Sequence, residues 1–222
     1  MEKYKKKLDF KISPIIIAQI KVNMDKSFIM TPNNTDPLNY YFYEEGFTRE
    51  ELNKIEKETA KLPLHSASTF RSGGDNTRNS KIKWVPQNTQ WWWLYEKLHN
   101  MAIEANSTLW KFGLFNMPEK IQYTEYLASQ NGKYEWHQDI GPAHGSIRKV
   151  SITVQLSEPD DYEGGDLELF MGGSFDDPNI VKAPRKAGCV FIFPSFLMHR
   201  IAPVTKGTRK SFVLWLGGAP LY

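Results

Sequence analysis

The chain has 222 residues, of which 41% are hydrophobic and 14% aromatic, which is ample for the core of one large domain. Its net charge is +3, but residues 1–11 hold five lysines against Glu2 and Asp9, so residues 12–222 are balanced at zero. This balance gives no electrostatic reason to expect DNA or RNA binding. The apolar run at residues 14–18 is too short to cross a bilayer, so we expect no membrane association.

The single cysteine, Cys189, excludes an intramolecular disulfide and agrees with a reducing compartment. It stands in the apolar run Cys189–Phe193, so we interpret it as a buried small hydrophobe rather than a nucleophile. Residues 14–18 also lack a signal-peptide cleavage pattern. These observations predict a cytoplasmic protein.

The pattern of the first 120 residues predicts helices that support the β-rich part of the chain. Residues 15–22 are consistent with an edge strand, and residues 31–37 have the composition of a loop. Thr48 and Glu51 have the spacing of a capping box, which predicts a helix that continues to Pro63. A second helix is expected over residues 90–110, and its buried stripe consists of Leu94, Leu98, Met101, Ala105 and Leu109. We interpret Trp91, Trp92 and Trp93 as core anchors rather than a ligand cage.

Residues 66–80, between the two helices, are polar and contain two adjacent glycines. This composition predicts a mobile loop. Two interpretations remain open: a plain surface connection, and a lid that closes over a pocket.

From Ile121 the apolar period changes from 3.6 to 2, which indicates strands. Short strands bounded by Gly, Pro, Asn and Asp clusters predict a sandwich or barrel. The expected fold class is α+β, mainly β: a jelly roll (double-stranded β-helix) with supporting N-terminal helices. We expect a single domain over 1–222, with helices and the loop in 1–120 and the jelly-roll core in 121–222. The expected strands lie near 121–128, 133–139, 147–156, 166–170, 179–183, 188–193, 199–204 and 208–216.

The segment Tyr134–Asp139 carries the clearest chemical signal. On a strand, His137 and Asp139 point to the same side, so an imidazole and a carboxylate converge on one point. His199, on a later predicted strand, is a candidate second imidazole. Two histidines and one carboxylate are the ligand set of non-haem Fe(II) oxygenases. Cupin-type metal proteins are an alternative, but they favour a His-x-His pair where this chain has Asp139.

Arg209 follows His199 by ten residues and places a fixed cation near the predicted metal. Arg209 and Ser211 share one strand face, so a guanidinium and a hydroxyl can bind the same anion. An arginine fork fits a carboxylate better than a lysine ammonium does.

Residues 126–222 resemble the catalytic core of Fe(II)- and 2-oxoglutarate-dependent dioxygenases. The most similar branch is the prolyl 4-hydroxylase-like group, which includes the PKHD-type hydroxylases. Residues 78–80 also resemble an Arg-x-Ser segment in the substrate loop of prolyl hydroxylases. The segments that carry the main resemblance are Tyr134–Asp139, Gln155–Pro159, Tyr162–Leu167, Ala187–Ser195, His199 and Pro203–Arg209.

The resemblance implies that His137, Asp139 and His199 ligate Fe(II). It implies that Arg209, assisted by Ser211, pairs with the distal carboxylate of 2-oxoglutarate, and that Tyr126 lines the same pocket. Gln155 stands where some relatives carry an aromatic residue. The cofactors implied are Fe(II), 2-oxoglutarate and O2, with ascorbate as a candidate reductant.

The leading hypothesis is a peptidyl hydroxylase that acts on proline and releases succinate and CO2. A second hypothesis assigns the same chemistry to a free small molecule. A third, from another class, is a jelly-roll binding protein without redox activity. The complete set of His137, Asp139, His199 and Arg209 argues against the third hypothesis.

Overall fold

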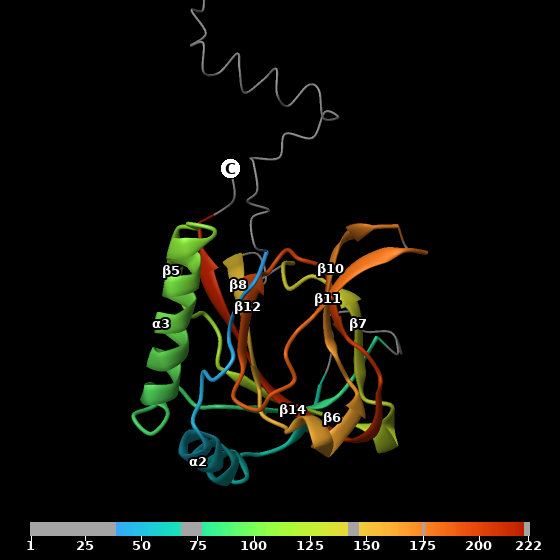
Figure 1. The fold of residues 1–222 in the computed structure, drawn as a ribbon. Helices are drawn as coiled ribbons and strands as arrows, with labels where there is room; N and C mark the ends of the chain where they lie inside the picture. The colour runs from blue at the N-terminus through green and yellow to red at the C-terminus, as the bar shows by residue number, and fades with distance from the viewer. Residues whose placement is uncertain (1–38, 68–76, 142–146, 175, 220–222) are drawn as a thin grey trace, which may run out of the picture. The chain divides into compact units, whose positions relative to one another are not determined.

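A computed structural model describes residues 39–67, 77–141, 147–174 and 176–219. The edge strand expected at 15–22, the loop at 31–37 and the centre of the 66–80 loop lie outside these residues. The described part contains two α-helices and two antiparallel sheets, which confirms the predicted jelly roll with helical support (Figure 1).

The larger sheet has nine strands and the smaller has five. The main path of the larger sheet is β1 (Tyr41–Tyr43), β12 (Val190–Pro194), β8 (Arg148–Gln155), β14 (Val204–Gly218), β6 (Gln122–Leu127), β4 (Lys81–Trp84) and β2 (His65–Ser66). Two further strands, β5 (Leu114–Asn116) and β9 (Tyr162–Gly164), also pair with β14. The smaller sheet runs β11 (Pro178–Lys182), β10 (Leu167–Gly173), β13 (His199–Ile201), β7 (Lys133–His137) and β3 (Arg78–Asn79).

Helix α2 (Arg49–Thr59) begins at the predicted capping box. The Thr48 hydroxyl accepts from the Glu51 backbone N–H at 3.3 Å, and the Glu51 carboxylate accepts from the Thr48 N–H at 2.8 Å. The helix ends at Thr59, before the predicted end at Pro63. Beyond Thr59 the chain continues as a tighter turn, in which the N–H groups of Lys61 and Leu62 donate to the Glu58 and Thr59 carbonyl oxygens, up to the residue before Pro63.

Helix α3 (Trp92–Thr108) buries Leu94, Leu98 and Ala105 as predicted. Trp91 is buried, whereas Trp92 is 58% exposed, so the prediction that all three tryptophans anchor the core is wrong for Trp92. Successive residues on a helix point about 100° apart, so three in a row cannot all face one side. Met101 and Leu109 are only partly buried.

Two apolar cores lie on opposite faces of the larger sheet. Helices α2 and α3 cover one face, and the smaller sheet lies on the other (Figure 1). Strand β12 shows the division, because Val190 and Ile192 belong to the helix-side core while Phe191 and Phe193 belong to the core between the sheets. The same alternation in β14 leaves Arg209 and Ser211 on the face opposite to Phe212.

Several predicted boundaries are wrong. The ends of the predicted 66–80 loop form β2 and β3, which pair with β4 and β7. Strand β7 ends at His137, so Asp139 lies just beyond it. Strand β14 is longer than predicted, and the sequence did not indicate β1, β4, β5 or β9. Short strands carry too few residues for an alternating pattern, so their pairing partners decide them.

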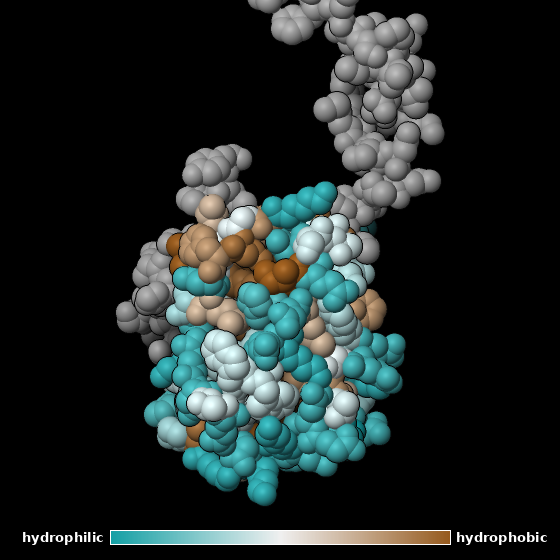
Figure 2. Space-filling view, turned by 90° about the vertical axis from the view of Figure 1, so that its left-hand side faces the viewer, coloured by the Kyte–Doolittle hydropathy of each residue, from teal (hydrophilic) through white to brown (hydrophobic). Residues whose placement is uncertain are grey.

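The outer face on the helix side is largely hydrophilic, with hydrophobic side chains gathered near one end (Figure 2). Among the described residues, no helix has the length and apolar character needed to span a membrane.

Candidate active site

A cavity of about 1020 Å³ opens between the two sheets. His137, Asp139, His199 and Arg209 all line it, together with Tyr126 and Ser211. The fold therefore brings all six residues singled out in the sequence to one cavity. It does so although β6 and β7 are far along the chain from β13 and β14.

His137, Asp139 and His199 form a compact group of possible metal ligands. Their nearest ligand atoms lie within 4.8 Å of one another. The Nε2 of His137 is 3.7 Å from one Asp139 carboxylate oxygen, and the Nε2 of His199 is 3.5 Å from the other. The two histidines face each other in register on the neighbouring strands β7 and β13.

Backbone carbonyls determine which nitrogen of each ring is available. His137 Nδ1 is 2.7 Å from the Glu135 carbonyl oxygen, and His199 Nδ1 is 2.9 Å from the Leu197 carbonyl oxygen. A carbonyl only accepts, so Nδ1 carries the proton in both rings and donates it. Each Nε2 is then left with a lone pair directed toward Asp139, as metal coordination requires.

Aromatic contacts hold both rings in place. Tyr134 stacks on His137 with ring centroids 3.5 Å apart, and Phe193 packs edge-on against His199 at 4.8 Å. The Arg78 guanidinium lies over the Tyr134 ring, 4.8 Å from its centroid. Arg78, from the segment that resembles a prolyl hydroxylase substrate loop, is thus part of the cavity wall.

The protonation states of the group suit a divalent metal. Burial, reinforced by the charge of His199, lowers the pKa of His137 to about 4. Burial alone would raise the pKa of Asp139, but the two imidazoles and the Ser151 hydroxyl outweigh it and keep that pKa below its ordinary value. A neutral imidazole and an ionised carboxylate are the forms that bind metals.

This shift predicts that acid destabilises the metal-free protein. The folded pKa of His137 is depressed below the ordinary value of 6.5, so between pH 6.5 and 4 the unfolded chain binds more protons. The free energy of unfolding should therefore fall by on the order of 3 kcal/mol as the pH drops through this window. Urea unfolding at a series of pH values measures this change in the free energy of unfolding. A His137→Gln variant should show a weaker dependence of the unfolding free energy on pH. An unchanged dependence in that variant would contradict the assignment of the effect to His137.

Arg209 is 2% exposed and sits on the inner face of β14, opposite Tyr126 of β6. Its Nη1 donates to the Ser211 hydroxyl at 3.1 Å, and its guanidinium carbon lies 5.8 Å from the Tyr126 ring centroid. Burial lowers the pKa of Arg209, while Tyr162 and Tyr126 act in the opposite direction. The charge of Asp166 also raises the pKa of Arg209, but Asp166 is ion-paired with Lys182 and Arg185. Among the described residues no carboxylate forms an ion pair with Arg209 itself. A buried cation without a directly paired carboxylate is suited to an anionic ligand.

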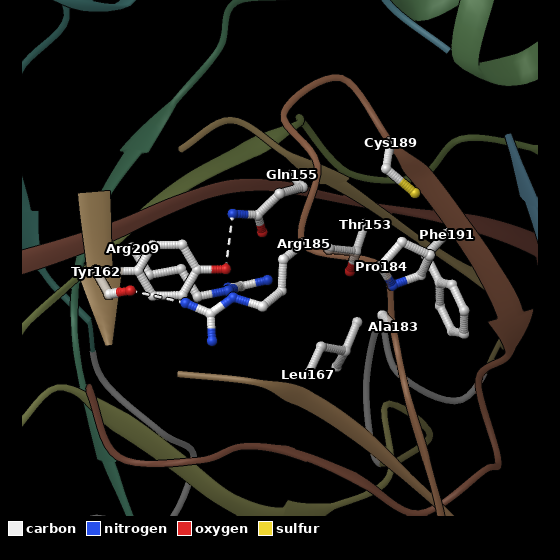
Figure 3. A pocket seen from close by; sticks show the side chains of 10 residues that line it. All are labelled: Thr153, Gln155, Tyr162, Leu167, Ala183, Pro184, Arg185, Cys189, Phe191 and Arg209. Carbon is white, nitrogen blue, oxygen red and sulfur yellow. Dashed lines mark hydrogen bonds between the residues drawn. The ribbon is translucent and has the colours of Figure 1, made fainter. Parts of the chain in front are cut away.

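A second, much smaller pocket of about 10 Å³ adjoins Arg209 (Figure 3). There the Gln155 amide donates to the Tyr162 hydroxyl at 3.1 Å, and the Arg185 guanidinium lies 4.1 Å from the Tyr162 ring centroid. Tyr162 therefore provides an aromatic ring beside Arg209, although the residue at position 155 is a glutamine.

At the cavity wall, Arg148 links three of its neighbours. It donates to both carboxylate oxygens of Glu119 and to the Asp139 carbonyl oxygen at 3.2 Å. Its guanidinium carbon lies 3.7 Å from the Trp215 ring centroid. These contacts hold the chain that follows Asp139 against β8 and β14.

The donor set fits Fe(II). Two imidazoles and one carboxylate form one group, and the only cysteine of the sequence is buried, with its pKa raised to about 11 by burial. Such ligands on one side leave other coordination positions open. The high pKa also confirms the interpretation of Cys189 as a small buried hydrophobe.

Comparison with known proteins adds an independent observation. Residues 121–217 match the family model described as the 2OG-Fe(II) oxygenase superfamily, where 2OG is 2-oxoglutarate. The match covers slightly less than half of the chain, and this segment, which holds all the candidate site residues, is similar to the superfamily. The similarity implies Fe(II), 2-oxoglutarate and O2 as cofactor and co-substrates, and the His137, Asp139 and His199 group agrees with it.

The curated proteins to which this chain is similar include PKHD-type hydroxylases. A PKHD-type hydroxylase of Xylella fastidiosa is 38% identical over 97 residues, which are 39% of this chain and 40% of the relative. A PKHD-type hydroxylase of Rippkaea orientalis is 28% identical over 176 residues, 78% of this chain and 75% of that one. The match therefore spans well under half the length of the Xylella relative.

Solved structures share the fold of this chain. A Pseudomonas putida prolyl-4-hydroxylase superposes with a TM-score of 0.63 and 19% identity, over 82% of this chain and 93% of that one. A Trichoplax adhaerens prolyl hydroxylase, solved with a peptide fragment of hypoxia inducible factor, has a TM-score of 0.64 and 14% identity, over 94% of each chain.

Sequence reasoning missed Ser151, Ser195 and Tyr162 as residues of the site. A signal was present in residues 150–155, where Ser151, Thr153 and Gln155 alternate with valine and isoleucine. All three polar residues are buried. Polar side chains on the inner face of a buried strand indicate a polar cavity wall.

Proposed function

We propose that this oxygenase hydroxylates an unactivated C–H bond, and that its substrate is a peptidyl proline. The observation that most supports the oxygenase chemistry is Arg209, a buried guanidinium that forms no ion pair with a carboxylate of the described residues and lies in the same cavity as the His137, Asp139 and His199 group. The cavity thus combines a metal-ligand set with an anion site, which a jelly-roll binding protein without redox activity does not need.

In this proposal His137 Nε2, His199 Nε2 and the Asp139 carboxylate hold Fe(II). When bound, the metal supplies the oxidising chemistry, in which 2-oxoglutarate is converted to succinate and CO2 while the substrate gains an oxygen atom. The protein binds and orients the reactants and limits the access of water.

Arg209 and Ser211 would bind the distal carboxylate of 2-oxoglutarate. The guanidinium donates two parallel hydrogen bonds most readily to a planar carboxylate. Tyr126 lies opposite Arg209 across the β6–β14 pair and covers one side of this position. Because Arg209 is buried, its interaction with a carboxylate is weakly screened by solvent.

A peptide substrate is supported by the size of the cavity and by the structural neighbours. A volume of about 1020 Å³ exceeds what 2-oxoglutarate alone needs. Two structural neighbours are prolyl hydroxylases, and one of them was solved with a peptide bound. A free small molecule remains the second candidate substrate.

Succinate release tests the proposal. The enzyme with Fe(II), 2-oxoglutarate and O2 would be incubated with proline-containing peptides, with the same peptides carrying alanine for proline, and with free proline. We expect succinate above the substrate-free rate only with the proline peptides, together with a gain of one oxygen mass in the peptide. Stimulation by free small molecules but no peptide would favour the second candidate. No succinate under any condition would overturn the proposed function.

A further inference from the structure

Two buried serines connect the candidate metal ligands to the larger sheet. Ser151 lies on β8 and Ser195 follows the end of β12, and both are completely buried. The Ser151 hydroxyl is 2.7 Å from an Asp139 carboxylate oxygen and 2.9 Å from the Ser195 hydroxyl.

Proton counting determines the direction of this hydrogen-bond chain. An ionised carboxylate only accepts, so Ser151 must donate its one proton to Asp139. The bond between the serines must then use the proton of Ser195, with Ser151 accepting. The order is Ser195 to Ser151 to Asp139, and each donor strengthens the next because the chain is buried.

Backbone contacts support the same connection. The Asp139 N–H donates to the Ser195 carbonyl oxygen at 2.9 Å, and the Ser195 N–H donates to the Lys149 carbonyl oxygen at 2.9 Å. His137 and His199 both lie on the smaller sheet, whereas Asp139 has left β7 and is attached to β8 and the end of β12. The relative position of the carboxylate and the two imidazoles therefore depends on this attachment.

We propose that Ser151 is a positioning residue for Asp139, supported by Ser195. Its hydrogen bond holds one carboxylate oxygen and so fixes the rotation of the carboxylate toward the two Nε2 atoms before a metal binds. Without this bond the carboxylate rotates more freely, and metal binding must then order it at a cost in affinity. The proposal rests on the proposed function, because it assumes that His137, Asp139 and His199 bind the metal.

The test is Mn(II) affinity, measured by the electron paramagnetic resonance signal of free Mn(II), without 2-oxoglutarate or substrate. Ser151→Ala should weaken binding by roughly 10- to 100-fold, the usual effect of removing a partner of a metal ligand. Ser151→Thr keeps the hydroxyl and should restore most of the affinity. Ser195→Ala leaves the Ser151 bond to Asp139 intact and should have a smaller effect than Ser151→Ala.

Thr153→Val is the matched control, because Thr153 is a buried polar residue two positions along the same strand. It should bind Mn(II) as the parent does. If Ser151→Ala binds within twofold of the parent, or Thr153→Val loses as much affinity, the proposal is wrong. If circular dichroism shows that Ser151→Ala does not fold, Ser195→Ala provides the test instead. Unchanged Mn(II) affinity in Ser195→Ala would then contradict the proposed hydrogen-bond chain from Ser195 through Ser151 to Asp139. A parent protein that binds no Mn(II) would overturn the metal site itself, which is a separate outcome.

Discussion

Replacing His137, Asp139 or His199 with alanine is expected to abolish hydroxylation and to reduce bound iron, while the fold is largely retained. Each residue is one of only three candidate ligands in a group whose ligand atoms lie within 4.8 Å of one another. Losing one leaves too few protein ligands for a stable site that still has open positions. Iron content and circular dichroism, measured on the same samples, give the result.

His65→Ala is the matched control for these variants. His65 also lines the cavity, but it is exposed on β2 and is not part of the ligand group. This variant should retain the iron content of the parent. Full iron occupancy in any one of the three ligand variants would remove that residue from the proposed ligand set.

Arg209→Ala is expected to weaken 2-oxoglutarate binding strongly while leaving metal affinity nearly unchanged. Breaking one side of a buried charged hydrogen-bonded pair costs on the order of 2–5 kcal/mol, much of it from the carboxylate left unpaired. At about 1.4 kcal/mol per factor of ten, the dissociation constant rises by tens to thousands of fold. Arg209→Lys should recover only part of the loss, since an ammonium lacks the planar fork.

Calorimetric titration of 2-oxoglutarate into the Mn(II)-loaded protein under nitrogen measures this change. Arg78→Ala is a suitable control, because Arg78 is a second guanidinium at the cavity but donates to Gln122 and Ser80. It should leave 2-oxoglutarate affinity close to that of the parent. An Arg209→Ala variant within about threefold of the parent would show that Arg209 is not the anchor.

The elements that the sequence predicted well depend on neighbours along the chain. The capping box at Thr48 and Glu51 needs only three residues of separation, so it formed where expected. The longer strands from β6 onward, such as β8 and β10, carry enough residues to show the period of two. The group of His137, Asp139 and His199 was recognised from residue types and motif resemblance, and the fold places these residues together.

Tertiary structure decided everything that depends on pairing between distant segments. The short strands β2, β3 and β4 have no pattern of their own and exist because β4, β7 and β6, respectively, provide their partners. Arg209 stands opposite Tyr126 only because β14 pairs with β6 in one register. A shift of one residue would turn Arg209 toward the helix-side core.

The contact between Ser151 and Asp139 is of the same kind. Their positions are only twelve residues apart, but the sequence between them does not show that the carboxylate leaves β7 and meets β8. The alternation of Ser151, Thr153 and Gln155 with apolar residues determines that one face of β8 is polar. Which ligand that face supports was decided by the packing of the two sheets, because only their apposition brings the serine hydroxyl within hydrogen-bond distance of the carboxylate.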